Sequence, residues 1–99
     1  TTAQADMKAR ALVEARVEAD RMLMATRTAL AADVDLLSAE ERAAIDGLMV
    51  SLEGIRGQDD AAAIDAATEA LAKGTEAFAA LRMNRGIRQA LAGKNIEAV

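Results

Sequence analysis

The sequence predicts an all-α fold, with one long N-terminal helix leading into a small antiparallel three-helix bundle. Alanine is abundant and proline is absent, and 53% of the 99 residues are hydrophobic against 28% charged, a composition typical of helical domains. Hydrophobic residues recur at steps of three and four rather than two, which favours helices over strands. The length allows one domain with one modest core.

The first element is a helix predicted over residues 6–32, within a segment 1–32 that has neither glycine nor proline. At 1.5 Å per residue this helix would be roughly 40 Å long. One of its stripes is predicted to face the core, and consists of Leu12, Ala15, Ala19, Leu23, Thr26 and Leu30. The bundle is expected to use residues 33–93 together with the end of this helix.

A second hydrophobic stripe on the same helix consists of Val13, Val17 and Met24, about a third of a turn from the first. Asp20 lies on this second side, four residues before Met24, and Arg16 is spaced to pair with it on the surface. A helix that is hydrophobic on two sides needs two partners. The second stripe has no evident partner elsewhere in the sequence, which makes these residues the candidate contact site.

A second helix is predicted from Ser38 to Ile55. Ser38 and Glu41 have the spacing of a capping box, and Gly57 stands where a left-handed helix end is favoured. The side predicted to face the core carries Ile45, Leu48, Met49, Leu52 and Ile55. The short connection 33–37 is too hydrophobic for a free loop, so we expect it to plug the core.

A third helix follows a turn in which Asp59 or Asp60 is suited to the N-cap. Its predicted core stripe consists of Ile64, Ala67, Leu71, Thr75, Phe78 and Leu81, with Phe78 as the aromatic anchor.

Beyond Leu81 the hydrophobic pattern changes side, to Met83, Ile87 and Leu91. The helix therefore either bends near Asn84-Gly86 or continues and shows a second stripe to another partner. We expect it to continue to about Ala92, with Gly93 as its stop and residues 94–99 as a flexible tail.

Composition argues against several functional classes. The net charge of −4 is unfavourable for binding nucleic acid, and the basic run Arg82, Arg85 and Arg88 fits a solvated helix end. With no histidine or cysteine and no phosphate-binding glycine pattern, we expect neither catalysis nor a metal or cofactor site in this chain. No hydrophobic run reaches the roughly 18 residues of a membrane span. Because the start has neither an initiator Met nor a signal peptide, we expect a fragment of a longer protein.

Several stretches resemble the helical lid of seventy-kilodalton heat-shock chaperones of the DnaK type. They are residues 17–30 (Val-Glu-Ala-Asp-Arg-Met-Leu-Met-Ala-Thr-Arg-Thr-Ala-Leu), 38–46 (Ser-Ala-Glu-Glu-Arg-Ala-Ala-Ile-Asp) and 57–65 (Gly-Gln-Asp-Asp-Ala-Ala-Ala-Ile-Asp). Residues 78–94 (Phe-Ala-Ala-Leu-Arg-Met-Asn-Arg-Gly-Ile-Arg-Gln-Ala-Leu-Ala-Gly-Lys) resemble the branch that serves bacterial iron–sulfur cluster assembly. The resemblance covers nearly the whole chain through its overall pattern rather than one diagnostic motif.

The resemblance implies a role for the second stripe. In this family the long helix lies over a β-sandwich that holds an extended peptide, and a helix acid at the position of Asp20 latches onto sandwich loops. Met24 matches a position where general-purpose members often carry a polar residue. The implied partners are the β-sandwich of the same parent chain and a client peptide, with an iron–sulfur scaffold protein as client. ATP or ADP would bind a cytoplasmic parent ATPase outside this chain.

A competing interpretation is a self-association or scaffold module, in which Val13, Val17 and Met24 form a helix–helix seam. A lid separated from its sandwich would also leave this stripe bare, so the isolated chain could dimerise through its long helix. Dimerisation alone therefore does not separate the two interpretations. The mixed charge of residues 10–27 argues against a third interpretation, an interfacial membrane helix.

Overall fold

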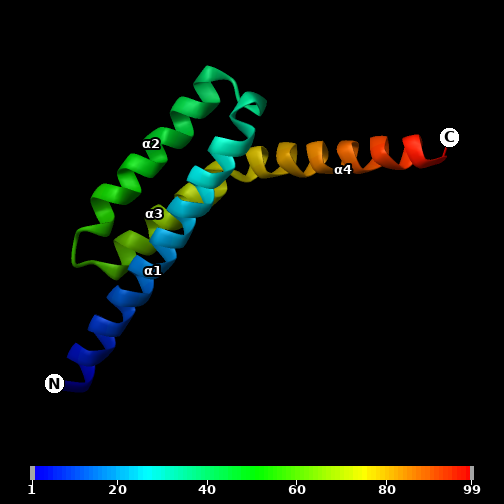
Figure 1. Cartoon of the computed structure of the whole chain (residues 1–99). Coiled ribbons are helices and arrows are strands. Elements are labelled where there is room, and N and C mark those ends of the chain that lie inside the picture. Colours follow the sequence, from blue (N-terminus) through cyan, green and yellow to red (C-terminus); the bar gives the residue numbers. More distant parts are fainter. Residues whose placement is uncertain (1, 99) are drawn as a thin grey trace.

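The computed structural model describes residues 2–98, with side chains described for residues 3–92. In chain order these residues form α1 (Thr2–Asp33), the 3₁₀ turn η1 (Val34–Leu36), α2 (Ala39–Arg56), α3 (Ala61–Gly74) and α4 (Glu76–Ala98) (Figure 1). No strand occurs over residues 2–98, which confirms the all-α prediction. The molecule is elongated, with extents of 70 × 29 × 17 Å.

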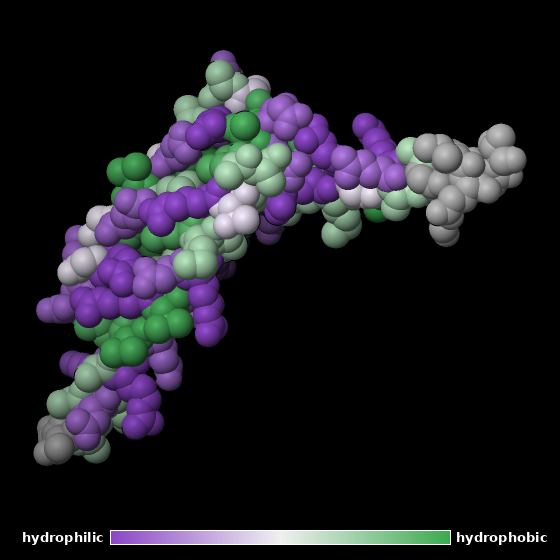
Figure 2. Space-filling view, viewed as in Figure 1, coloured by the Kyte–Doolittle hydropathy of each residue, from purple (hydrophilic) through white to green (hydrophobic). Residues whose placement is uncertain are grey.

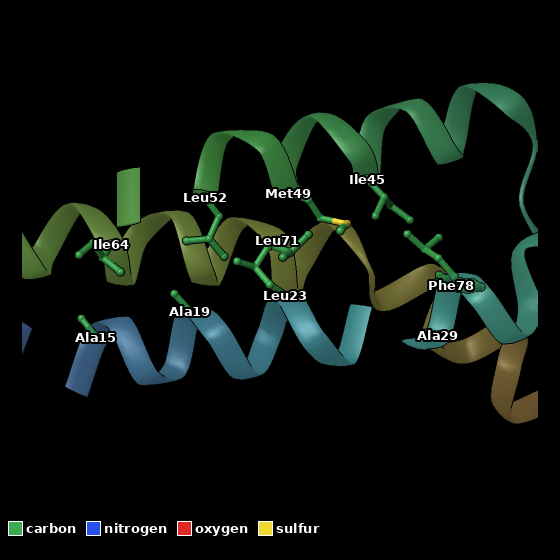
Figure 3. Close-up of a cluster of buried hydrophobic side chains, with 11 residues drawn as sticks. Ala15, Ala19, Leu23, Ala29, Ile45, Met49, Leu52, Ile64, Leu71 and Phe78 are labelled. Atoms are coloured by element: carbon green, nitrogen blue, oxygen red, sulfur yellow. The ribbon is translucent and has the colours of Figure 1, made fainter. Parts of the chain in front are cut away.

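The bundle consists of α2, α3 and the C-terminal part of α1, and α3 packs extensively against both of the others (Figure 1). Side chains from all three helices converge in one core (Figure 3). Its buried hydrophobic members are Ala15, Ala19, Leu23, Ala29, Leu30, Ile45, Met49, Leu52, Ile64, Leu71 and Phe78. The predicted first stripe of α1 is confirmed as the core-facing stripe. It includes the buried Thr26, whose hydroxyl donates to the carbonyl of Met22 at 2.7 Å.

Both ends of α2 are set by local sequence. The Ser38 hydroxyl accepts from the backbone N–H of Glu41, and the Glu41 carboxylate accepts from the backbone N–H of Ser38, each at 3.1 Å. This confirms the capping box, and the bond from Ser38 lowers the pKa of Glu41. The left-handed end predicted at Gly57 is wrong, because its φ of −74° and ψ of −11° continue the right-handed turn. At the start of α3, Asp60 is the N-cap and accepts from Ala63 N–H at 3.1 Å.

The connection between α1 and α2 lies against the bundle. Leu36 and Leu37 are half-buried and pack on the core cluster, as expected of a hydrophobic plug. The turn η1 itself is short, and the N–H of Leu37 donates to the carbonyl of Val34 at 3.0 Å.

The third predicted helix is divided at Gly74-Thr75 rather than near Asn84-Gly86, where α4 is continuous. Thr75 has a φ of −102° and a ψ of 0°, and its hydroxyl donates back to the carbonyl of Ala72 at 3.0 Å. A glycine followed by a back-bonded threonine is a recognised cause of helix bending. A Cβ on Gly74 would also collide with the Leu48 side chain, so the glycine permits close packing of α3 on α2.

This bend directs α4 away from the bundle (Figure 1). Phe78 is buried as predicted, with 3% of its surface exposed, but Leu81 is not part of the core because α4 has already left it. Met83, Ile87 and Leu91 are exposed along α4. The helix continues to Ala98, so the stop predicted at Gly93 is wrong. The tail predicted over 94–99 lies outside the residues whose side chains are described, and Val99 lies outside the described residues altogether.

Charged side chains hold the base of α4 to the end of α1. Asp33 accepts from Arg82 Nε at 2.8 Å and from Arg85 Nη1 at 3.1 Å, while Asp35 accepts from Arg85 Nη2 at 2.5 Å. The Arg82 guanidinium also lies over the Phe78 ring, 5.9 Å from its centroid. The solvated helix end predicted for this basic run is therefore wrong at its first two arginines. The basic run lies near the start of α4, within reach of Asp33 of α1 and Asp35 of η1.

Replacing Leu52 with Ala should lower the free energy of unfolding by about 2–5 kcal/mol, because Leu52 is fully buried and the change leaves a cavity. The matched control is Val50→Ala on the same helix, where 68% of the side chain is exposed and the change should stay within about 0.5 kcal/mol. Urea unfolding of the chain measures both. Equal losses for the two variants would contradict the packing described for α2.

The Asp33 cluster predicts a defined pH dependence. The hydrogen bond from Arg82, and then that from Arg85, lower the pKa of Asp33 against the opposing effect of burial. A lowered native pKa stabilises the fold above the unfolded pKa of about 3.9, and the contribution is lost as pH falls through the native value. The difference in melting temperature between the wild type and Asp33→Asn should therefore be largest at neutral pH and shrink below about pH 4. A difference that stays constant on acidification would count against these ion pairs.

Candidate functional site

The exposed stripe of α1, defined as Val13, Val17 and Met24, is not covered by the other residues whose side chains are described, 3–92. These three residues are 59%, 42% and 68% exposed. The bundle packs on another side of α1, where Ala19 and Leu23 are buried. Figure 2 shows a hydrophobic area over the N-terminal half of α1 in this view, with hydrophilic side chains across much of the bundle. Within the described part of the chain the stripe therefore has no covering partner, as the sequence predicted.

The helix α1 is longer than the helix α3 that packs against it. With 32 residues it is roughly 48 Å long, whereas the 14 residues of α3 cover roughly 21 Å. The part of α1 before Leu12, which is the first residue to pack on the core cluster, therefore extends past the bundle (Figure 1). Val13, Val17 and Met24 lie beyond this point, on the outer side of the packed part.

Asp20 lies at the edge of the exposed stripe, within about 60° of each of its members around the helix axis at 100° per residue. It does not pair with Arg16, its predicted partner one turn earlier. Instead it forms a two-pronged ion pair with Arg56 at the end of α2: Arg56 Nε donates to Oδ1, and Nη2 donates to Oδ2 at 2.7 Å. The side chains of Asp20 and Arg56 remain 51% and 39% exposed.

This ion pair has a clear electrostatic signature. The hydrogen bond from Arg56 is the main cause that lowers the pKa of Asp20, and the same bond raises the pKa of Arg56. Asp20 is accordingly a carboxylate at neutral pH.

Further polar contacts bridge α1 and the end of α2 on either side of Asp20. Arg16 Nε donates to the backbone carbonyl of Arg56 at 3.1 Å, and Arg16 Nη2 donates to Asp59 at 3.0 Å. Two turns further along α1, Arg27 donates to Glu53 at 2.6 Å. We call these contacts the ion-pair row, whose members are Arg16, Asp20, Arg27, Glu53, Arg56 and Asp59.

The site is thus a hydrophobic strip with a carboxylate at its edge, a pattern suited to docking against another protein surface. Over residues 2–98 no helix is long and hydrophobic enough to cross a membrane. Sequence reasoning selected Val13, Val17 and Met24 for the strip and Asp20 for its edge, and it missed the contact of Asp20 with Arg56. That residue offered no local signal beyond being a basic residue at a helix C-terminus, where the dipole alone explains it.

Replacing both Val13 and Met24 with Ser should leave the free energy of unfolding of the chain within about 0.5 kcal/mol of the wild type, because neither side chain packs on the bundle. Leu23→Ala, at a buried position next to Met24, should instead cost about 2–5 kcal/mol. Chemical unfolding of the two variants makes the comparison. A large loss in the Val13/Met24 variant would mean that the stripe is part of the core.

The chain is similar along nearly its whole length to curated bacterial chaperones. It is 69% identical over 98 residues to the chaperone protein HscA homolog of Paracidovorax citrulli and 57% identical over 98 residues to that of Burkholderia thailandensis. The homolog of Methylibium petroleiphilum is 65% identical over 99 residues. Each alignment covers at least 99% of this chain but 16% of the relative, so the chain spans about a sixth of the length of the proteins it matches. No family model matches it. These identities confirm the chaperone resemblance predicted from the sequence: the chain corresponds to one segment of the HscA chaperones.

Proposed function

We propose that this chain is the helical lid of the substrate-binding domain of a molecular chaperone, and that it gates the release of a bound peptide. The observation that carries the proposal is the exposed stripe on a helix whose other side is fully packed. The chain also matches a segment of HscA homologues, and its sequence resembles the helical lid of DnaK-type chaperones. Both similarities support the same role.

In this proposal the bundle is a stiff support and α1 is the surface that closes. The stripe docks on the β-sandwich of the same parent chain, with Asp20 as its polar latch. Burying a Val or Met side chain contributes about 1.5–3 kcal/mol at most, so three half-exposed side chains contribute a few kcal/mol. That is enough to favour a closed state while leaving it reversible, as a gate requires.

The energy source and the client lie outside the chain. ATP or ADP binds an ATPase domain of the cytoplasmic parent protein: the lid closes with ADP and swings away with ATP. The client is a peptide, and the similarity to HscA homologues favours a scaffold protein of iron–sulfur cluster assembly.

Self-association through Val13, Val17 and Met24 is the second candidate function, because the same exposure would suit a second copy of the helix. The two candidates differ in the full-length protein. A lid covers the stripe within one molecule, whereas an association module leaves it available and gives a concentration-dependent dimer.

Deleting the segment that corresponds to this chain (residues 1–99 in the present numbering) from the ADP-bound full-length chaperone should greatly speed the release of a fluorescently labelled peptide, because the lid is then missing. Asp20→Ala should also speed release, by a smaller factor, because the docked stripe stays in place. A suitable control is Asp46→Ala, because Asp46 pairs with Arg42 of the same helix, α2, and belongs neither to the stripe nor to the ion-pair row. If deletion leaves the release rate unchanged, the lid proposal fails; if Asp20→Ala matches the control, the latch assignment fails.

A further inference from the structure

Both carboxylate oxygens of Asp20 are already engaged within the chain. The guanidinium of Arg56 lies along the carboxylate, with Nε on one oxygen and Nη2 on the other. In this bidentate arrangement Arg56 occupies the edge of the carboxylate where one donor group can reach both oxygens at once. A second donor approaching Asp20 would find only the outer lone pairs of each oxygen free.

Asp33 shows how a carboxylate of this chain is shared between two cations. One of its oxygens accepts from Arg82 and the other from Arg85, so each arginine receives a single oxygen. Asp20 is not shared in this way, because Arg56 holds both oxygens. For an external partner to gain even one of them, the pair with Arg56 would have to loosen.

Arg56 is itself held in place on the far side. Its backbone carbonyl accepts from Arg16, whose guanidinium also contacts the carbonyl of Gln58 and the carboxylate of Asp59. The end of α2 is therefore fastened to α1 one turn before Asp20. This anchoring holds the Arg56 backbone against α1, which leaves its guanidinium within reach of Asp20.

From this geometry we infer that Arg56 competes with the β-sandwich for Asp20 and thereby sets the strength of the latch. The inference rests on the proposed function, in which Asp20 latches the closed lid. Arg56 acts through Asp20 and is a positioning residue. In the open lid the fork satisfies Asp20, and in the closed lid the sandwich donor must displace or share it.

The sign of the effect follows from this exchange. Any free energy gained by the internal pair in the open state is subtracted from the latch when the lid closes. The guanidinium also repels a cationic donor that approaches the same carboxylate. Because the pair is exposed, both effects are modest, and removing Arg56 should tighten the latch by about 2- to 5-fold.

The test is the release of labelled peptide from the ADP-bound full-length chaperone carrying Arg56→Gln. Release should be about 2- to 5-fold slower than in the wild type, opposite to the effect of Asp20→Ala. In the double variant Asp20→Ala/Arg56→Gln the slowing should vanish, because Arg56 acts through Asp20. Slower release is a readout that a loosened bundle would not produce.

Arg42→Gln is the matched control, because it removes the same charge from α2 and breaks an ion pair, to Asp46, that lies outside the ion-pair row. Its release rate should equal that of the wild type. Hydrogen exchange of α1 and α2 in each full-length variant reports whether the bundle stays folded. Unchanged or faster release in a folded Arg56→Gln protein would overturn the inference. If deletion of the lid leaves release unchanged, it is the proposed function that fails.

Discussion

Burial of α3 between α1 and α2 is the constraint on which the rest of the structure depends. Ile64 and Leu71 are fully buried, and they meet Leu52 from α2 and the small residues Ala15 and Ala19 from α1. Alanines on α1 allow α3 to approach closely, while the larger side chains of α2 and α3 fill the space between them. Since α3 takes up the core-facing side of α1, the remaining hydrophobic side of that helix is left for another surface.

Local signals in the sequence were enough to predict most of the bundle. The capping box at Ser38, the cap at Asp60 and the core stripe of α1 each depend on residues within one or two turns, so spacing alone identified them. The end of the third helix was harder. Its hydrophobic period runs on through Phe78, and nothing in that period marks Thr75 as the point where the helix bends and leaves the core.

The candidate site was predictable in its hydrophobic part and not in its ionic part. The exposed stripe could be predicted because the sequence gives α1 two hydrophobic sides, whereas the bundle covers one of them. The partner of Asp20, in contrast, lies 36 positions away at the end of α2, and an arginine there has a sufficient local explanation. The same limit hid the pairing of Asp33 with Arg82 and Arg85, which are 49 and 52 positions away. Long-range ion pairs depend on tertiary geometry, which residue spacing along the sequence does not predict.

The departure of α4 from the bundle has a consequence for how the chain opens locally. From Met83 to Ala92 this helix has no buried side chain, so its own backbone hydrogen bonds and a few charged contacts near its base sustain it. Most of the stability of a helix in a protein comes from tertiary packing, which this part of α4 lacks. Amide protons in this part of α4 would exchange through fraying, at a free energy of opening well below that of global unfolding. Amide protons around Leu52 and Ile64 would exchange only when the whole bundle unfolds. We therefore expect the chain to open in two parts, with α4 unfolding at a lower free energy than the cooperative bundle.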